Sequence, residues 1–242
     1  MRTVFCLLLL FLARTLVSQE LTGKALLEKA IAHHDPQNQW PTFTGALAIV
    51  MTTPDGKERH SRIALDLPRQ YYKSEVLQGG DTIVGTLHKT ACSITLNGSP
   101  DIPEQDRKRL GISCERVEKM RNYYTYLYGL PMKLKDPGTH LDPKVERVRF
   151  NQKEYLRLRA SYDPEVGTDT WYFYFDPDSF AMEAYQFFHD ETKNDGEYIL
   201  LSETMTVNAI KMPKIRSWHY NRDGGHLGTD VLIQAQGHTA KD

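Results

Sequence analysis

Residues 42–97 read TFTGALAIVMTTPDGKERHSRIALDLPRQYYKSEVLQGGDTIVGTLHKTACSITLN. Short runs of strand-forming residues alternate in this stretch with turn signals such as Pro54–Gly56 and Gly79–Gly80. Runs of this length, separated by Gly, Pro and Asp residues, are typical of consecutive antiparallel strands. The stretch therefore predicts strands over residues 43–52, 58–67, 70–77, 81–88 and 91–96.

Helical patterns flank this run of strands. Thr22 has the position of an N-cap for an amphipathic helix that continues to about His33. Between residues 101 and 129 the apolar residues again follow a helical period, and Gly129 and Pro131 provide stop signals at the end. The sequence therefore predicts an N-terminal helix and a helical insert after the first group of strands.

Strand-type runs return after the insert. They cover residues 145–150, 156–160, 170–175, 181–189, 197–207, 215–220 and 227–236. An antiparallel sheet of about eleven strands rarely stays open and flat, because strand twist makes it curl, close or split. We expect an α+β fold in which a curved antiparallel half-barrel sheet of about 11 strands wraps around the N-terminal helix and the helical insert.

The first residues have the layout of a secretory signal. Residues 1–18 contain Arg2, an apolar run from Val4 to Ala13, and the small residue Ser18 before the expected cut. The run would span only about 15 Å as a helix, against roughly 30 Å of membrane hydrocarbon. Cys6 lies inside the run and cannot be the lipidated cysteine that follows a lipoprotein signal. We expect a periplasmic or secreted protein with no transmembrane segment in its mature chain.

Composition limits the classes of function. The chain has 30 basic and 31 acidic residues, and loss of Arg2 and Arg14 with the signal leaves 28 basic residues and a net charge of −3. This balance argues against binding to nucleic acid. No Pro/Gly/Ser-rich linker divides residues 19–242, which predicts a single domain. No familiar catalytic or nucleotide-binding motif is present, so we expect no cofactor and no enzyme activity.

Two cysteines remain after removal of the signal. Cys92 and Cys114 form an even pair in an exported protein, which favours a disulfide. Two separate thiols, one in a strand and one at the start of a helix, are the alternative. A reactive Cys114 is a further alternative, because a helix N-terminus lowers the pKa of a thiol.

Several local blocks are more specific than the order of elements. They are His34-Asp35-Pro36 with Trp40, Leu127-Tyr128-Gly129-Leu130-Pro131, Trp171 to Pro177, Gly196-Glu197-Tyr198, Met212-Pro213-Lys214 with Trp218, and Leu227-Gly228-Thr229-Asp230. With the order of elements, these blocks resemble an uncharacterised family of exported Bacteroidetes proteins that has a LolA-like fold. The resemblance implies a half-barrel sheet that cups a hydrophobic cavity under helices, as in the lipoprotein carriers LolA and LolB. It implies no catalytic residues.

Aromatic residues form the first candidate site. Residues 171–175 alternate, so that Trp171, Phe173 and Phe175 share one face of a strand. Such a face could line a pocket for a lipid or another hydrophobic small molecule, or it could be ordinary core. The predicted ligand-binding residues are Tyr123, Tyr124, Tyr126, Trp171, Phe173, Phe175, Tyr185, Phe187, Trp218 and Tyr220. The helical insert would act as a lid over them.

Arginines form the second candidate site. Pairing Phe150 with Leu156 in a hairpin would place Arg147, Arg149, Arg157 and Arg159 on one face. A guanidinium cluster suits an acidic partner, such as an envelope lipoprotein or lipid headgroups, whereas a solvated face is the simpler alternative. The protein would then be a non-catalytic scaffold or interaction module.

Histidines allow two weaker hypotheses. His33, His34 and Asp35 could supply metal ligands, but adjacent helix residues diverge, so we expect no metal site and a role at the helix end instead. His219 and His226 flank a turn and Asp230 follows, which would suit an exported hydrolase if the three side chains met in one cleft. The leading hypothesis remains a soluble carrier for a lipid or for the acyl chains of a lipoprotein.

Overall fold

A computed structural model describes residues 20–237, with side chains up to residue 234. The predicted signal, residues 1–18, lies outside the described residues. The helices are α1 (Gly23–His34), α2 (Glu104–Leu110) and α3 (Cys114–Gly129), with short 3₁₀ turns η1 (Trp40–Thr42), η2 (Met132–Lys135) and η3 (Glu191–Lys193). No helix among the described residues is both long enough and apolar enough to cross a membrane.

The strands form one antiparallel sheet. They are β1 (Thr44–Thr52), β2 (Glu58–Asp66), β3 (Tyr71–Gln78), β4 (Asp81–His88), β5 (Ala91–Leu96), β6 (Thr139–Leu141), β7 (Glu146–Phe150), β8 (Lys153–Tyr162), β9 (Thr170–Phe175), β10 (Met182–Phe188), β11 (Glu197–Val207), β12 (Ile210–Tyr220) and β13 (His226–Gly237). Their spatial order is β5-β4-β3-β2-β1-β13-β12-β11-β10-β9-β8-β6, with β7 paired to β8. The last strand therefore returns to pair with the first, which places both halves of the sequence in one sheet.

The sheet is open and curved, as predicted, and has 13 strands instead of about eleven. The three-residue β6 was too short to give a sequence signal. Strand β12 begins five residues earlier than expected and runs through Pro213. Pro213 lies opposite Thr204, and a proline is tolerated there because the pairing of β11 with β12 is interrupted beside it at Glu203, which has a positive φ of 52°.

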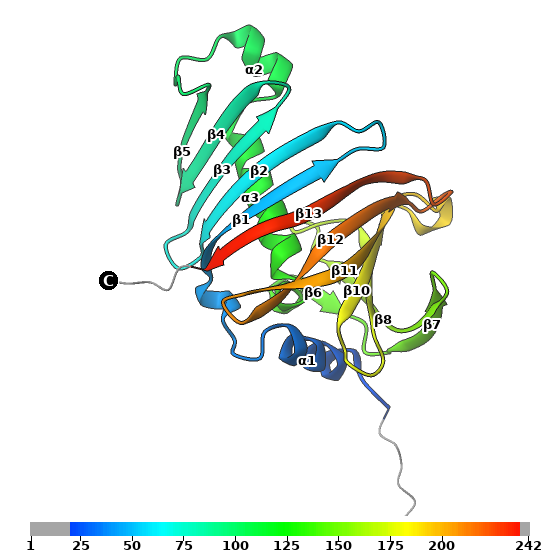
Figure 1. Cartoon of the computed structure of the whole chain (residues 1–242). Helices are drawn as coiled ribbons and strands as arrows, with labels where there is room; N and C mark the ends of the chain where they lie inside the picture. The colour runs from blue at the N-terminus through cyan, green and yellow to red at the C-terminus, as the bar shows by residue number, and fades with distance from the viewer. Residues whose placement is uncertain (1–19, 238–242) are drawn as a thin grey trace, which may run out of the picture.

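Helix α3 lies against the concave face of the sheet, and α1 packs at the other end of the molecule from α2 (Figure 1). Gly85 of β4 allows α3 to come close, because a Cβ there would lie 2.7 Å from Val117 Cγ2. Strands β2–β5 with α2 project from the rest of the molecule as an arm (Figure 1). We use "arm" for residues 58–113 and "body" for the other described residues.

Two neighbouring residues hold the C-terminal end of α1 in place. The His34 ring is 5% exposed; its Nδ1 donates to Lys211 O at 2.8 Å, and its Nε2 accepts from Met182 N–H at 2.9 Å. Burial lowers the pKa of His34 to about 4. Asp35 accepts from the backbone N–H groups of Gln39 and Trp40. The expectation that His34 serves the helix dipole is wrong, because this ring is neutral and bonds α1 to two strands.

The expected register of the β7–β8 hairpin is also wrong. Phe150 pairs with Lys153, because Asn151 and Gln152 form a two-residue turn with φ of 44° and 69°. The register differs from the expected one by an odd number of residues, which turns one strand's side chains to the opposite face relative to the other.

Candidate ligand cleft and buried polar cluster

Most of the predicted aromatic residues meet beneath the second half of α3. Trp171 is central: its ring centroid lies 4.9 Å from Phe187, 5.6 Å from Tyr126 and 6.1 Å from Tyr185. Trp218 continues the cluster, with centroids 6.4 Å from both Tyr185 and Tyr123. Phe173 and Tyr185 are completely buried, and Tyr124 nearly so.

The other two predicted residues lie outside this cluster. Phe175 is buried in the main core opposite Met182, and Tyr220 lies at the strand end, where Arg222 stacks on its ring. The rings of the cluster pack against one another and against α3, so they form the core of the body. Their proposed role as a ligand wall is untested, and the packing gives no support to a cavity among them.

A cleft lies instead in the arm, between the α2–α3 segment and the concave face of β2–β5. Its volume is about 90 Å³. Its walls are largely apolar; they include Val76, Ile83, Ile94, Leu110, Ile112, Val117 and Met120. Polar groups come from Arg59, Ser74, Gln78, Ser113, Arg116 and Tyr124. The arrangement of an apolar wall with a few polar groups is typical of small-molecule sites.

Two strands of the arm carry buried polar atoms: Arg59 lines the cleft, whereas Tyr72 lies farther along the sheet and does not line it. The Nε of Arg59 and the hydroxyl of Tyr72 are buried and have no hydrogen-bond partner among the described residues. Burial raises the pKa of Tyr72, whose hydroxyl lies near Ser74, and burial also raises the pKa of Tyr124, which lies near Arg59. Because burial keeps its phenol protonated near neutral pH, Tyr124 offers a hydrogen-bond donor in the lining of the cleft.

A second polar cluster lies deeper, where the end of α3 meets β12 and β13. Arg216 is 1% exposed; it donates to Leu127 O at 3.1 Å and Pro213 O at 3.2 Å, and its guanidinium lies 4.1 Å from the centre of the Tyr128 ring. Its neighbour across the strand pair is Asp230, which accepts from Trp218 Nε1 at 3.1 Å. Burial raises the pKa of Asp230.

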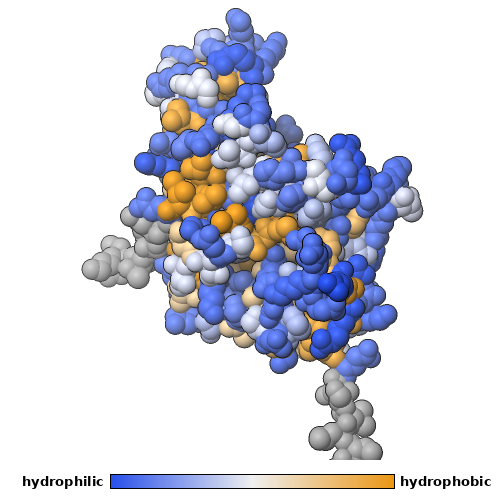
Figure 2. All heavy atoms as spheres, turned by 45° about the vertical axis from the view of Figure 1, so that its right-hand side comes forward, coloured by the Kyte–Doolittle hydropathy of each residue, from blue (hydrophilic) through white to orange (hydrophobic). Residues whose placement is uncertain are grey.

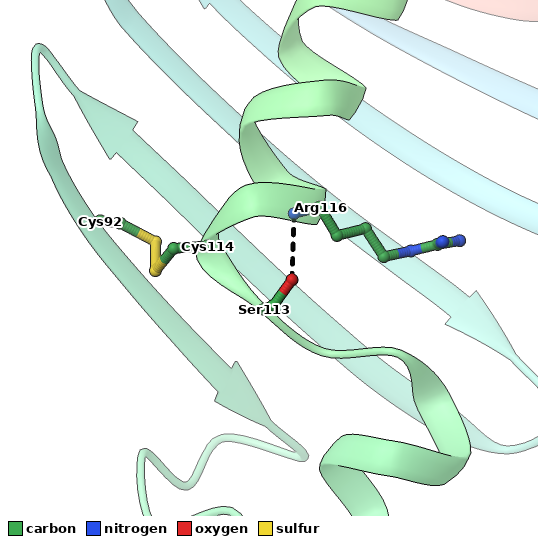
Figure 3. The surroundings of a disulfide bond; sticks show 4 residues. All are labelled: Cys92, Ser113, Cys114 and Arg116. Atoms are coloured by element: carbon green, nitrogen blue, oxygen red, sulfur yellow. Dashed lines mark hydrogen bonds between the residues drawn. A yellow bond between two sulfur atoms is a disulfide. The ribbon is translucent and has the colours of Figure 1, made fainter.

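Arg216 thus holds the end of α3, and a disulfide holds its beginning. Cys92 of β5 and Cys114 in the first turn of α3 are bonded, next to the Ser113 side chain that caps the helix (Figure 3). A helix fastened at both ends cannot lift away from the sheet as a unit. The expectation that the whole insert is a lid is therefore wrong, and only the segment of residues 98–113 around α2 is free of these two attachments.

The predicted arginine face does not form. Arg147 lies opposite Leu156 and Arg149 opposite Glu154, whereas Arg157 pairs with Glu146 at 2.6 Å on the other face of the hairpin. Arg159 lies 3.7 Å from Glu191. The face shown in Figure 2 is mostly hydrophilic, with hydrophobic side chains gathered in a band across its middle. The four arginines therefore do not make one docking surface, and their role in binding a partner is untested.

The three residues of the hydrolase hypothesis lie on both faces of the sheet. His219 and His226 are neighbours, with centroids 5.3 Å apart, on the outer face. Asp230 faces α3 on the concave side, because it accepts from the Trp218 indole. Ser217 Oγ contacts His219 Nε2 at 2.9 Å, but this pair does not line the cleft. The three side chains therefore do not meet in one cleft, as the hydrolase hypothesis requires.

An open antiparallel sheet that curls over a helix defines the LolA-like class of folds. Similar solved structures are a LolA superfamily protein from Nitrosomonas europaea (12% identity, TM-score 0.50, covering 91% of this chain and 96% of that one) and a domain described as an outer membrane lipoprotein-sorting protein from Vibrio parahaemolyticus (11%, 0.50, 89% and 93%). A DUF1329 family protein from Desulfovibrio piger is also similar (7%, 0.51, 93% and 96%). At these identities the likeness shows the fold.

The family is shown by sequence. The sequence model of the family DUF6503, a family of unknown function, matches residues 2–235. The chain belongs to this family. No curated protein matches the sequence. The resemblance to a family with a LolA-like fold is confirmed at this level, whereas an origin in Bacteroidetes stays a prediction.

Sequence reasoning named Tyr124 of the cleft and Trp218 and Asp230 of the buried cluster, but it missed most of the other residues of these two sites. Arg59 and Arg216 are charged residues within strands, so neither has a signal of burial. The cleft lining comes from five separate segments that meet only in the fold. One signal was available: Val117 and Met120 lie on the predicted apolar face of α3, and an apolar helix face packs against another element of the protein.

Proposed function

We propose that this protein is a soluble, exported carrier that binds a hydrophobic ligand, a lipid or the acyl chains of a lipoprotein, in the cleft of the arm. The observation that carries the proposal is the apolar cleft on the concave face, whose covering segment includes the end of α2, a helix with no buried residue of its own. The signal-like residues 1–18 support export. One of the similar structures is described as an outer membrane lipoprotein-sorting protein domain, which agrees with a carrier.

The cover of the cleft is thinly attached. A small separate cluster of Leu96, Ile102 and Ile112 lies beneath it, and Arg109 bridges from α2 to Asp81 at 3.0 Å. The segment is bounded by glycines with left-handed backbone, Gly98 at φ 85° and Gly111 at φ 63°. Few buried contacts between two such positions are what a moving cover requires.

Ligand entry requires the cover to move. A volume of about 90 Å³ is well below the roughly 300–1,000 Å³ of common small-molecule sites. The disulfide fixes the start of α3 on β5, so the cleft can widen only by displacement of residues 98–113 away from β3 and β4. We infer that α2 is the lid and that α3 is a fixed wall.

Native mass spectrometry of the mature protein, purified from its own envelope and followed by lipid extraction, tests the proposal. We expect a stoichiometric lipid or acylated adduct. Ile83→Trp would fill the cleft and abolish the adduct, whereas Val84→Trp on the other face of the same strand would keep it. A clean apo mass in the wild type, or an adduct that survives Ile83→Trp, would contradict the proposal.

The proposal gives no residue a catalytic role. A scaffold that binds an envelope protein through Arg147 and Arg149 is the alternative outcome of the same measurement, since it predicts no adduct and a partner lost when both exposed arginines are replaced.

A further inference from the structure

We infer that the disulfide between Cys92 and Cys114 controls the opening of the cleft. The intact bond holds the first half of α3 on the sheet, and reduction of the bond by a dithiol frees that half of the helix and widens the cleft. This inference rests on the proposed function and adds the regulation of the same site. Its basis is the place of the bond between the two walls of the cleft, the exposure of Cys114, and the sparse packing of the helix beside it.

The disulfide joins the two walls of the cleft. Cys92 lies on β5, two residues before Ile94, which lines the sheet side. Cys114 is the first residue of α3 and lies between Ser113 and Arg116, which line the helix side. The bond crosses from the strand to the start of the helix (Figure 3), and β5 ends the strand order of the sheet. The bond therefore ties the helix wall to the edge of the sheet.

Few other contacts hold the first half of α3. Within residues 114–123, Val117 is the only buried residue, and Met120 and Tyr123 are half-buried. The second half of the helix contains the other buried residues and accepts the hydrogen bond from Arg216. Segments with few buried contacts open at a lower free-energy cost than the packed core. Without the disulfide, the start of α3 can therefore move while its end stays fixed.

The bond is open to attack by a thiolate, because Cys114 is exposed and Cys92 is half-buried. One thiolate of a dithiol reductant attacks the Cys114 sulfur, the S–S bond breaks, and Cys92 leaves as a thiolate that takes up a proton. The second thiolate of the reductant attacks the reductant's sulfur in the mixed disulfide and releases Cys114, whose thiolate the N-terminus of α3 stabilises before it is protonated. The protein gains two electrons and two protons, and the reductant becomes a disulfide.

Reduction makes a second wall of the cleft movable. With the bond intact, the cleft of about 90 Å³ can widen only through residues 98–113. With the bond broken, Ile112 and Val117, which flank Cys114 on the helix side, can separate from Ile94 on the sheet side. A hydrophobic ligand then enters between the strand and the helix, so its uptake is faster in the reduced form.

Reduction of the folded mature protein by dithiothreitol tests the movement of the helix. Intact mass measures the gain of hydrogen at the two cysteines, and amide hydrogen exchange measures the opening. We expect full reduction without denaturant and exchange about tenfold faster in residues 98–120, with exchange in residues 124–128 unchanged. Reduction only in the presence of urea, or equal acceleration in both segments, would overturn the inference, because the bond would then stabilise the whole fold.

Uptake of the neutral fluorescent probe phenylnaphthylamine by the delipidated mature protein tests the effect on the cleft. Stopped-flow fluorescence gives the association rate in the disulfide form and in the reduced form. We expect the reduced form to bind the probe about tenfold faster. Equal rates in the two forms would overturn the inference and leave the proposed function standing. No binding in either form would overturn both.

A double variant assigns both effects to the bond. Cys92→Ser combined with Cys114→Ser should show the exchange and the uptake of the reduced form without any reductant, and dithiothreitol should change neither. Reduced wild type blocked with iodoacetamide gives the same comparison without a substitution, in case the double variant does not fold. Exchange and uptake like those of the disulfide form, in the double variant or in the blocked protein, would overturn the inference.

Discussion

The arm and the body use the same sheet in different ways. In the body, the concave face is filled by interlocking aromatic rings and by the end of α3, and Arg216 and His34 bond across elements. In the arm, the same face is covered by residues 110–113 and the first half of α3, α2 itself buries no residue, and a cleft remains beside Gly85 and Ile94. The difference shows that one curved sheet can combine a rigid half with a half that can open, because packing density is decided by what covers the sheet.

The largest expected effect is in the body. Arg216→Ala removes both hydrogen bonds to carbonyls and leaves Asp230 without its buried cationic neighbour. We expect the free energy of unfolding to fall by about 3–5 kcal/mol, the range for breaking a buried charge pair. Urea unfolding followed by tryptophan fluorescence measures the change. Arg222→Ala replaces an exposed arginine in the turn before β13; it serves as the control and should change stability little. A loss below about 1 kcal/mol for Arg216→Ala would show that the end of α3 does not depend on this residue.

Acid should weaken the body through His34. Its folded pKa of about 4 lies below the ordinary value of 6.5, so the unfolded chain takes up the proton first. Stability is therefore complete above pH 6.5 and falls as the pH drops toward 4, by up to about 3 kcal/mol for this shift. Urea midpoints between pH 7.5 and 4 measure the slope.

The His34 slope is isolated by a variant pair. His34→Gln should be less stable than the wild type at pH 7.5 and should lose less on acidification, whereas exposed His60→Gln should keep the wild-type slope. Burial of Asp230 acts in the opposite direction, because its raised pKa favours the folded state in acid. An identical slope in the wild type and His34→Gln would refute the assignment.

Two glycines at packing contacts of α3 compare the halves directly: Gly129 is the last residue of the helix, and Gly85 lies in β4 against it. A Cβ at Gly129 would lie 2.4 Å from Trp40 Cζ2, and a Cβ at Gly85 would lie 2.7 Å from Val117 Cγ2. Trp40 is enclosed in the body, whereas Val117 borders the cleft and can shift into it. We expect Gly129→Ala to destabilise by roughly 1–3 kcal/mol and Gly85→Ala by less. Thermal unfolding of both variants gives the order, and equal losses would mean that the arm is packed as tightly as the body.

The smallest effect on stability is expected in the cover. Arg109→Ala removes the bridge from α2 to Asp81 at the surface of the arm. The midpoint of urea unfolding should stay within error. Amide hydrogen exchange in α2 and association of the hydrophobic ligand should both become faster. Arg107→Ala in the same helix is the matched control and should leave exchange unchanged. Unchanged exchange in Arg109→Ala would mean that the cover is held by its apolar contacts instead.

The sequence by itself determined the element order and the fold class. Alternation over residues 42–97 and the helical period over 101–129 predicted the strands and the insert, because these periods follow from local backbone geometry. The alternation in 171–175 predicted that Trp171, Phe173 and Phe175 share one face of a strand, and the structure turns this face to the core. The pairing of Cys92 with Cys114 was one of several open alternatives, and the structure contains that bond.

Only the tertiary structure decided the sites. The turn at Asn151 and Gln152 set a register that separated the arginines. Asp230 shares a face of the sheet with its partner Arg216, whereas His219 lies on the opposite face. The Nε of Arg59 and the whole side chain of Arg216 are buried because strands distant in sequence and α3 cover them, which no local pattern records. Periodicity is a property of neighbouring residues, whereas a cleft and a buried charge depend on which distant surfaces meet.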